Sequence, residues 1–116
     1  MTVRDIVENL PAHVVYGPPG FIDRAVHQVI AGDLMSDMLL SVEGEALMVT
    51  SLATEQTVRS ADLIGASAIL LVNDKLPTIE MKRLAEECEI TLLATPMPMF
   101  ESCTTLGFLQ NSRHET

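Results

Sequence analysis

The stretch Ala68-Ile69-Leu70-Leu71-Val72 decides the fold, because its apolar residues follow one another with no polar position between them. Two similar runs flank it, Ala46-Leu47-Met48-Val49-Thr50 before it and Ile90-Thr91-Leu92-Leu93-Ala94 after it. A strand with such a run has side chains covered on both faces, which is typical of a parallel sheet. The three runs therefore predict central strands of a mostly parallel sheet.

Helical patterns follow each of these runs. We expect helices over residues 54–64, from Thr78 onward and over residues 97–110, with Thr54 and Thr78 as N-caps. In the second helix the apolar residues recur at i, i+3, i+4 and i+7, namely Met81, Leu84, Ala85 and Cys88. Strands alternating with helices predict a single three-layer α/β domain, with right-handed crossovers and helices flanking a small, mostly parallel sheet.

The N-terminal part adds shorter elements. We expect a helix over residues 3–10, a strand at 13–16, a turn at 17–20 and a further strand over 24–31. Nothing in the sequence suggests a linker or a second domain. The α/β domain is predicted to span residues 1–110, and residues 111–116 to form a loose tail.

A short apolar helix is expected directly after Gly32. Asp33 is placed to cap it, and the residues behind Asp33 are apolar on almost every side of the helix. Such a helix must be covered, and a second subunit is a natural cover for it in a domain this small. The sequence therefore predicts a homodimer whose interface contains Leu34, Met35, Met38 and Leu39.

Composition narrows the possible partners. The chain has 116 residues and a formal net charge of −9. We therefore expect no binding to nucleic acid, which requires Lys and Arg to neutralise phosphates, and no binding to an anionic membrane surface.

The longest apolar runs are too short to span a bilayer and no targeting signal is recognisable, so we expect a cytoplasmic protein. Cys88 and Cys103 are expected to be buried, reduced thiols.

Polar residues gather where the predicted parallel strands end. Ligands of open parallel sheets usually bind at this edge, and Ser51, Asn73 and Thr95 follow the three central strands. We predict that these residues and Asp33 bind a small molecule. The alternative is that they only cap helices and close turns, which is the ordinary role of such residues at strand ends.

No arrangement of residues indicates catalysis. His13, His27 and His114 are scattered, which argues against a metal site, and no nucleophile has a recognisable base. Gly17-Pro18-Pro19-Gly20 lacks the Lys of a phosphate-binding loop. We therefore expect no enzyme activity, no metal and no cofactor.

The order of segments resembles the DRTGG domain family. The resemblance covers residues 1–110 and rests on Asp23-Arg24, on the block Gly32-Asp33-Leu34-Met35-Ser36-Asp37-Met38 and on the apolar run that ends in Asn73. The family's Thr-Gly-Gly is not present, since the chain reads Ala25-Val26-His27 after Arg24. The resemblance also extends to the N-terminal region of HPr kinase/phosphorylase and the middle region of phosphate acetyltransferases.

Membership would imply a regulatory or dimerising domain without catalytic activity. It would single out Gly32, Asp33, Ser36, Asp37 and Asn73 as site or interface residues. Our hypothesis is a regulatory, ligand-sensing homodimer that binds a small molecule such as a nucleotide. The alternative is a purely structural interaction module that docks onto itself or onto a partner enzyme and has no small ligand.

Overall fold

The computed structural model describes residues 1–31 and 45–114, with the backbone alone over residues 112–114. Its centre is a five-stranded sheet with the strand order β1-β5-β4-β3-β2. The strands are β1 (His13–Tyr16), β2 (Gln28–Ala31), β3 (Ala46–Thr50), β4 (Ala68–Leu71) and β5 (Thr91–Ala94). Strands β2 to β5 are parallel, and β1 joins β5 antiparallel at one edge. The prediction of a small, mostly parallel sheet is confirmed.

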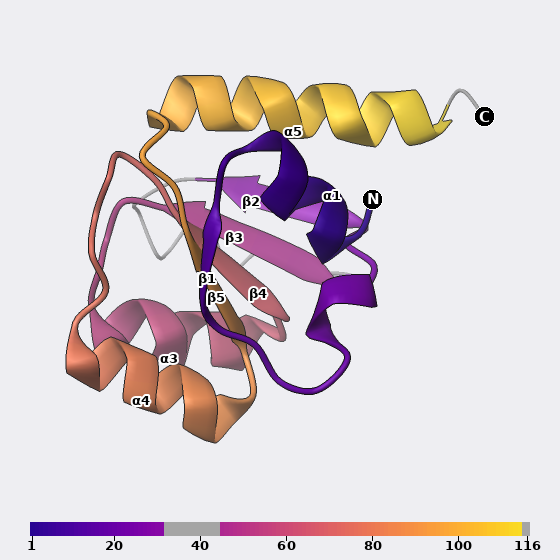
Figure 1. Ribbon diagram of the computed structural model, residues 1–116. Coiled ribbons are helices and arrows are strands. Elements are labelled where there is room, and N and C mark those ends of the chain that lie inside the picture. Colours follow the sequence, from indigo (N-terminus) through magenta and orange to yellow (C-terminus); the bar gives the residue numbers. More distant parts are fainter. Residues whose placement is uncertain (32–44, 115–116) are drawn as a thin grey trace.

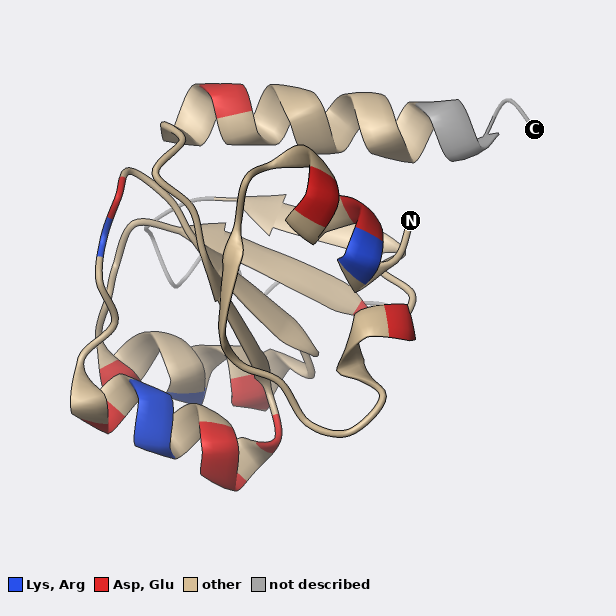
Figure 2. Ribbon diagram, in the orientation of Figure 1, with Lys and Arg blue, Asp and Glu red and all other residues tan. Residues whose placement is uncertain are grey.

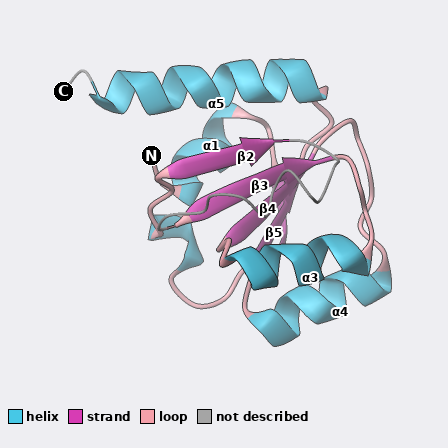
Figure 3. Ribbon diagram, turned by 180° about the vertical axis from the view of Figure 1, so that it is seen from behind, coloured by secondary structure: helices cyan, strands magenta, loops and turns pink. Residues whose placement is uncertain are grey.

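Helices cover both faces of this sheet (Figure 1). Helices α3 (Glu55–Ile64) and α4 (Ile79–Cys88) lie on one face, while α1 (Val3–Asn9) and α5 (Met99–His114) lie on the other. The view from behind in Figure 3 shows the same three layers. A single 3-10 turn, η1 (Phe21–Asp23), follows β1.

Each central strand contributes side chains to two hydrophobic cores. In β4, Ile69 and Leu71 face α3 and α4, whereas Ala68 and Leu70 face α1 and α5. All four residues of β4 are buried, as are those of β3 and β5. The continuous apolar runs therefore exist because both faces of the sheet are covered.

The two predicted helix caps differ in how they act. The Thr78 hydroxyl accepts a hydrogen bond of 3.0 Å from the Met81 backbone N–H and caps α4 as expected. Thr54 holds the N-cap position of α3, but its side chain makes no capping bond. Its hydroxyl instead lies 3.5 Å from that of Thr57, which donates to the Leu52 carbonyl at 2.8 Å.

Two boundaries differ from the sequence prediction by four residues, at 28 instead of 24 and at 114 instead of 110. The strand expected over 24–31 begins only at Gln28, because the preceding residues pair with the N-terminus: Val26 N–H donates to the Met1 carbonyl at 2.7 Å. Helix α5 continues to His114, into the predicted tail, and the Gln110 side chain donates to the His27 carbonyl at 3.0 Å. No proline interrupts the helix there. The division of the chain at residue 110 stays a prediction.

Two further expectations concern the cysteines and the first apolar helix. Cys88 and Cys103 are free thiols, but each is partly exposed rather than buried. The predicted interface helix, with Leu34, Met35, Met38 and Leu39, lies outside the described residues. Within residues 1–31 and 45–114, we find no helix whose length and apolar character would let it cross a membrane.

Candidate functional site

The strand register brings the predicted ligand-binding residues to one edge of the sheet. Leu71 of β4 pairs with Thr50 of β3 on one side and with Ala94 of β5 on the other. The next residues along the three strands are therefore Ser51, Val72 and Thr95, on neighbouring strands that lie about 4.8 Å apart. The loops that leave this edge lie together at the left of Figure 1. Asp33, the fourth predicted residue, lies outside the described residues.

Asn73 is exposed and links this edge to α5. Its backbone has a φ of 60°, in the left-handed region, and the next residue, Asp74, has a φ of 59°. The Asn73 N–H donates to the Met97 carbonyl at 2.8 Å. Its side-chain Oδ1 accepts from the Met99 N–H at 3.1 Å, the first backbone donor of α5. The Asn73 side chain therefore stabilises the start of a helix that begins 26 residues later in the chain.

Thr95 has a structural role at the same edge. Its side chain is buried, and its hydroxyl donates to the Leu10 carbonyl at 2.6 Å. The same oxygen accepts from the Met97 N–H at 3.3 Å. With one hydrogen bond donated and one accepted, the buried Thr95 hydroxyl holds the end of α1 and the loop after β5 in place.

The end of β3 shows a similar division between buried and accessible groups. Thr50 is buried, and its hydroxyl accepts from the Leu52 N–H at 3.1 Å. Ser51 is half-buried and already engaged in interactions of its own. The edge thus combines two accessible polar residues, Ser51 and Asn73, with two buried hydroxyls that shape the turns around them.

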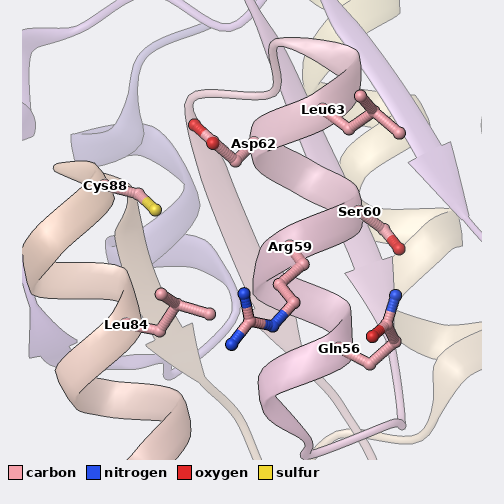
Figure 4. A pocket seen from close by; sticks show the side chains of 7 residues that line it. All are labelled: Gln56, Arg59, Ser60, Asp62, Leu63, Leu84 and Cys88. Carbon is pink, nitrogen blue, oxygen red and sulfur yellow. The ribbon is translucent and has the colours of Figure 1, made fainter.

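A pocket of 320 Å³, which sequence reasoning missed, lies over the outer face of α3 and α4. Figure 4 shows Leu84 and Cys88 of α4 on one side, opposite Arg59 and Asp62 of α3, whereas Gln56, Ser60 and Leu63 lie along the other side of α3. The pocket contains none of the predicted site residues. No sequence signal marked it, because it depends on the packing of two helices that are separate in sequence.

The chemistry of this pocket is weak. Burial raises the pKa of the Cys88 thiol, and the nearby charges of Asp62 and Glu87 raise it further, so the thiolate is disfavoured. Arg59 is paired with Glu55 on the same helix at 3.6 Å. An exposed pair of this kind contributes little to stability. We find no arrangement for nucleophilic catalysis in this pocket.

A second pocket, of 300 Å³, lies at the opposite edge of the sheet. It includes Ser67 and Ile90, which directly precede β4 and β5, and Arg24. The Arg24 guanidinium is paired with Glu45 at 3.3 Å. Among the described side chains, those of residues 1–31 and 45–111, no group of three or more His, Cys, Asp or Glu is arranged to hold a metal ion.

Comparison with solved structures identifies a protein of similar fold. The crystal structure of the CBS and DRTGG domains of the regulatory region of Clostridium perfringens pyrophosphatase, complexed with its activator diadenosine tetraphosphate, matches with a TM-score of 0.70. The match covers 90% of this chain at 16% sequence identity, and this chain spans 45% of that one. No family model matches the sequence. No curated protein matches it either.

The similarity supports a fold of the CBS and DRTGG kind. It agrees with the resemblance to DRTGG domains seen in the sequence, although membership of that family stays a prediction.

Proposed function

We propose that this protein is a regulatory module that senses a small molecule, and that the molecule is a nucleotide. The observation that carries the proposal is the structural similarity to a regulatory region that binds diadenosine tetraphosphate. The match extends over nearly the whole of this chain. In this proposal the protein acts without catalysis of its own and regulates a partner enzyme.

We place the ligand at the carboxyl edge of the parallel strands. Ser51 and Asn73 are the accessible polar residues there, and Asp33 completes the set predicted from the sequence. The Asn73 Oδ1 is engaged by the Met99 N–H, but its amide nitrogen donates to no described residue. Those N–H groups would serve a phosphate or a base carbonyl. Thr95 supports the loop rather than contacting the ligand, because its hydroxyl is occupied.

A thermal-shift screen followed by calorimetric titration tests this proposal. Diadenosine tetraphosphate, ATP, ADP and AMP are each added to the purified full chain. A nucleotide at 100 times its Kd should stabilise the fold by about 2.7 kcal/mol. The proposal is wrong if no nucleotide raises the melting temperature and none gives a binding isotherm.

Variants then locate the site. We expect Ser51→Ala and Asn73→Gly to weaken binding at least tenfold, since Gly keeps the left-handed backbone of residue 73 while the amide is lost. The matched control is Asn111→Ala, an exposed amide about 18 Å further along α5 than Met99. Equal affinity of the Asn73 and Asn111 variants would remove the carboxyl edge as the site.

We also propose that the protein is a cytoplasmic homodimer. Two free thiols fit a reducing compartment. The sequence-based interface of Leu34, Met35, Met38 and Leu39 predicts that Met38→Asp yields monomers or insoluble protein, because a charge would enter an apolar contact. Light scattering of that variant tests the prediction, and an unchanged dimer removes this segment from the interface.

The second candidate function is an interaction module with no small ligand. It is favoured by two phenylalanine rings on α5 that are 80% and 71% exposed, those of Phe100 and Phe108. A stable dimer that responds to no nucleotide would select this function over the first.

A further inference from the structure

Helix α5 carries a stripe of exposed residues with an aromatic ring at each end, on the side that faces away from the sheet. Phe100, Thr104 and Phe108 follow one another every four residues, and all three are exposed. The opposite side of the helix contributes Ser102 and Leu106 to the protein interior. In Figures 1 and 3 the helix lies across the molecule with no other described element on its outer side. Two exposed aromatic rings on one helix face offer apolar area to another molecule.

The stripe is symmetric about its midpoint. Thr104 lies four residues from each ring, and the rings are separated by about 12 Å along the helix axis. A second copy of α5, related by a two-fold axis through Thr104, would place its Phe108 against Phe100 and its Phe100 against Phe108. Rows of side chains spaced by four residues are the ridges that pack helices at about −50°. The stripe is therefore complementary to itself.

Gly107 adds an independent observation. It lies in the interior of α5, where Gly stabilises a helix less than Ala does. A Cβ added to Gly107 would meet no atom within 4 Å, so packing within this chain does not require the glycine. Three residues from Thr104 and one from Phe108, it leaves a shallow place beside the stripe. The absence of a side chain leaves room there for an aromatic ring of a neighbouring helix.

The distribution of charge favours contact between two copies through α5 rather than through α3 and α4. Two copies with a net charge of −9 each repel one another. Figure 2 shows that α3 and α4 carry several charged residues. Among the described side chains of α5, in contrast, Glu101 is the one charged group. The local repulsion between two copies is therefore smaller where their α5 helices meet than where α3 and α4 would meet.

We propose that two copies of this chain pair through α5, antiparallel, about a two-fold axis at Thr104. This inference rests on the homodimer of the proposed function and assigns it a surface on α5, in place of the sequence-based interface at residues 34–39. Each ring offers roughly 150 Å² of apolar area, so the two rings supply less than half of the ~800 Å² per partner of a standard interface. We therefore expect a dimer whose Kd lies in the micromolar range and whose population rises with concentration.

Charge substitutions test the surface by sedimentation equilibrium between about 1 and 200 µM, a range set to bracket that Kd. We expect Phe100→Asp and Phe108→Asp to raise the dimer Kd at least thirtyfold, so that both are mostly monomeric at concentrations where the wild-type protein is mostly dimeric. The matched controls are Leu76→Asp and Ile79→Asp, whose side chains are 75% and 73% exposed and lie outside α5. Because all four side chains are exposed, the substitutions should leave the fold intact, which circular dichroism verifies.

The outcomes are distinct. Loss of the dimer in the phenylalanine variants alone supports the proposal. A wild-type protein that is monomeric at 200 µM overturns it, as does a dimer that persists in Phe100→Asp. A dimer that persists there but is lost in Met38→Asp assigns the interface to residues 34–39 instead.

A cross-link tests the symmetry. In a chain with Cys88→Ser and Cys103→Ser, Thr104→Cys should form an intermolecular disulfide under mild oxidation, because the axis brings the two Cβ atoms to about 4 Å. Glu80→Cys on α4 is the matched exposed control and should not cross-link. Equal cross-linking at both positions would refute the axis. Nucleotide titration of Phe100→Asp separates this result from the proposed function, since a monomer that still binds leaves ligand sensing intact.

Discussion

Replacing Thr95 by Val tests whether the carboxyl edge depends on one buried hydroxyl. The two side chains have nearly the same shape, so the substitution exchanges a hydroxyl for a methyl group and leaves packing almost unchanged. The hydroxyl donates to the Leu10 carbonyl at 2.6 Å and accepts from the Met97 N–H at 3.3 Å. Leu10 itself is fully buried. Its carbonyl would therefore lose a partner in a place where water does not replace it.

The expected loss is dominated by this carbonyl. A buried acceptor left without a partner costs about 1–3 kcal/mol, whereas an ordinary hydrogen bond contributes about 1 kcal/mol net. The Met97 N–H is only partly buried, so it adds less. We expect Thr95→Val to lower the free energy of unfolding by about 2–3 kcal/mol. For a domain of this size that corresponds to roughly 8–12 °C in melting temperature.

Urea denaturation followed by circular dichroism measures this loss, at one protein concentration for every variant. The control is Thr91→Val at the start of β5, the strand that Thr95 follows, since Thr91 is equally buried and we find no hydrogen bond from its hydroxyl to another described residue. We expect the control to change stability by less than 1 kcal/mol. If both variants lower the free energy of unfolding by the same amount, the hydrogen bond from Thr95 to Leu10 adds no stability of its own and our account of the carboxyl edge is refuted.

Three further changes have defined outcomes. Asn73→Ala should lower the free energy of unfolding by about 2 kcal/mol, because it removes the hydrogen bond to the Met99 N–H and keeps a side chain at positive φ. Asn73→Gly should lower it by less than about 1 kcal/mol, and the reverse order in urea denaturation would contradict this account. Gly17→Ala should cost about 1–3 kcal/mol because its Cβ would lie 2.4 Å from the Phe21 ring, and a double-mutant cycle with Phe21→Ala should abolish that cost. Burial raises the pKa of the Cys103 thiol, so iodoacetamide should label it more slowly in the folded than in the unfolded chain near pH 8. The stability that this thiol contributes is present below the pKa of the unfolded chain and is lost as pH rises through the higher pKa of the folded chain. A ratio of folded to unfolded labelling rates that does not change with pH would therefore contradict the raised pKa of Cys103.

The architecture could be predicted from sequence because burial on both faces leaves a direct trace in it. The run Ala46–Thr50 coincides with β3, and the runs at 68–72 and 90–94 differ from β4 and β5 by a single end residue. Local chemistry also placed the cap at Thr78, since a cap and the N–H that it accepts from are three residues apart. Signals of this kind are contained in short windows of the chain.

The details of the site were not predictable in this way. The sequence placed Asn73 and Thr95 correctly at strand ends, but the partners of their side chains lie 26 and 85 residues away. Whether a polar residue at a strand end contacts a ligand or stabilises a distant helix depends on the assembled fold. For the same reason, the pocket over α3 and α4 left no pattern in the sequence.

The bond from Asn73 to Met99 joins the two proposals physically. Asn73 belongs to the proposed ligand edge, and α5, which begins at Met99, carries the proposed dimer surface. A ligand that accepts from the Asn73 amide nitrogen and reorients the side chain would change the bond from Met99 to Oδ1, and with it the first turn of α5, where Phe100 is the second residue. By thermodynamic linkage, if the ligand changes the dimer Kd by some factor, dimerisation changes the Kd of the ligand by the same factor. In this arrangement the Asn73 side chain alone couples ligand binding at the carboxyl edge to dimerisation through α5.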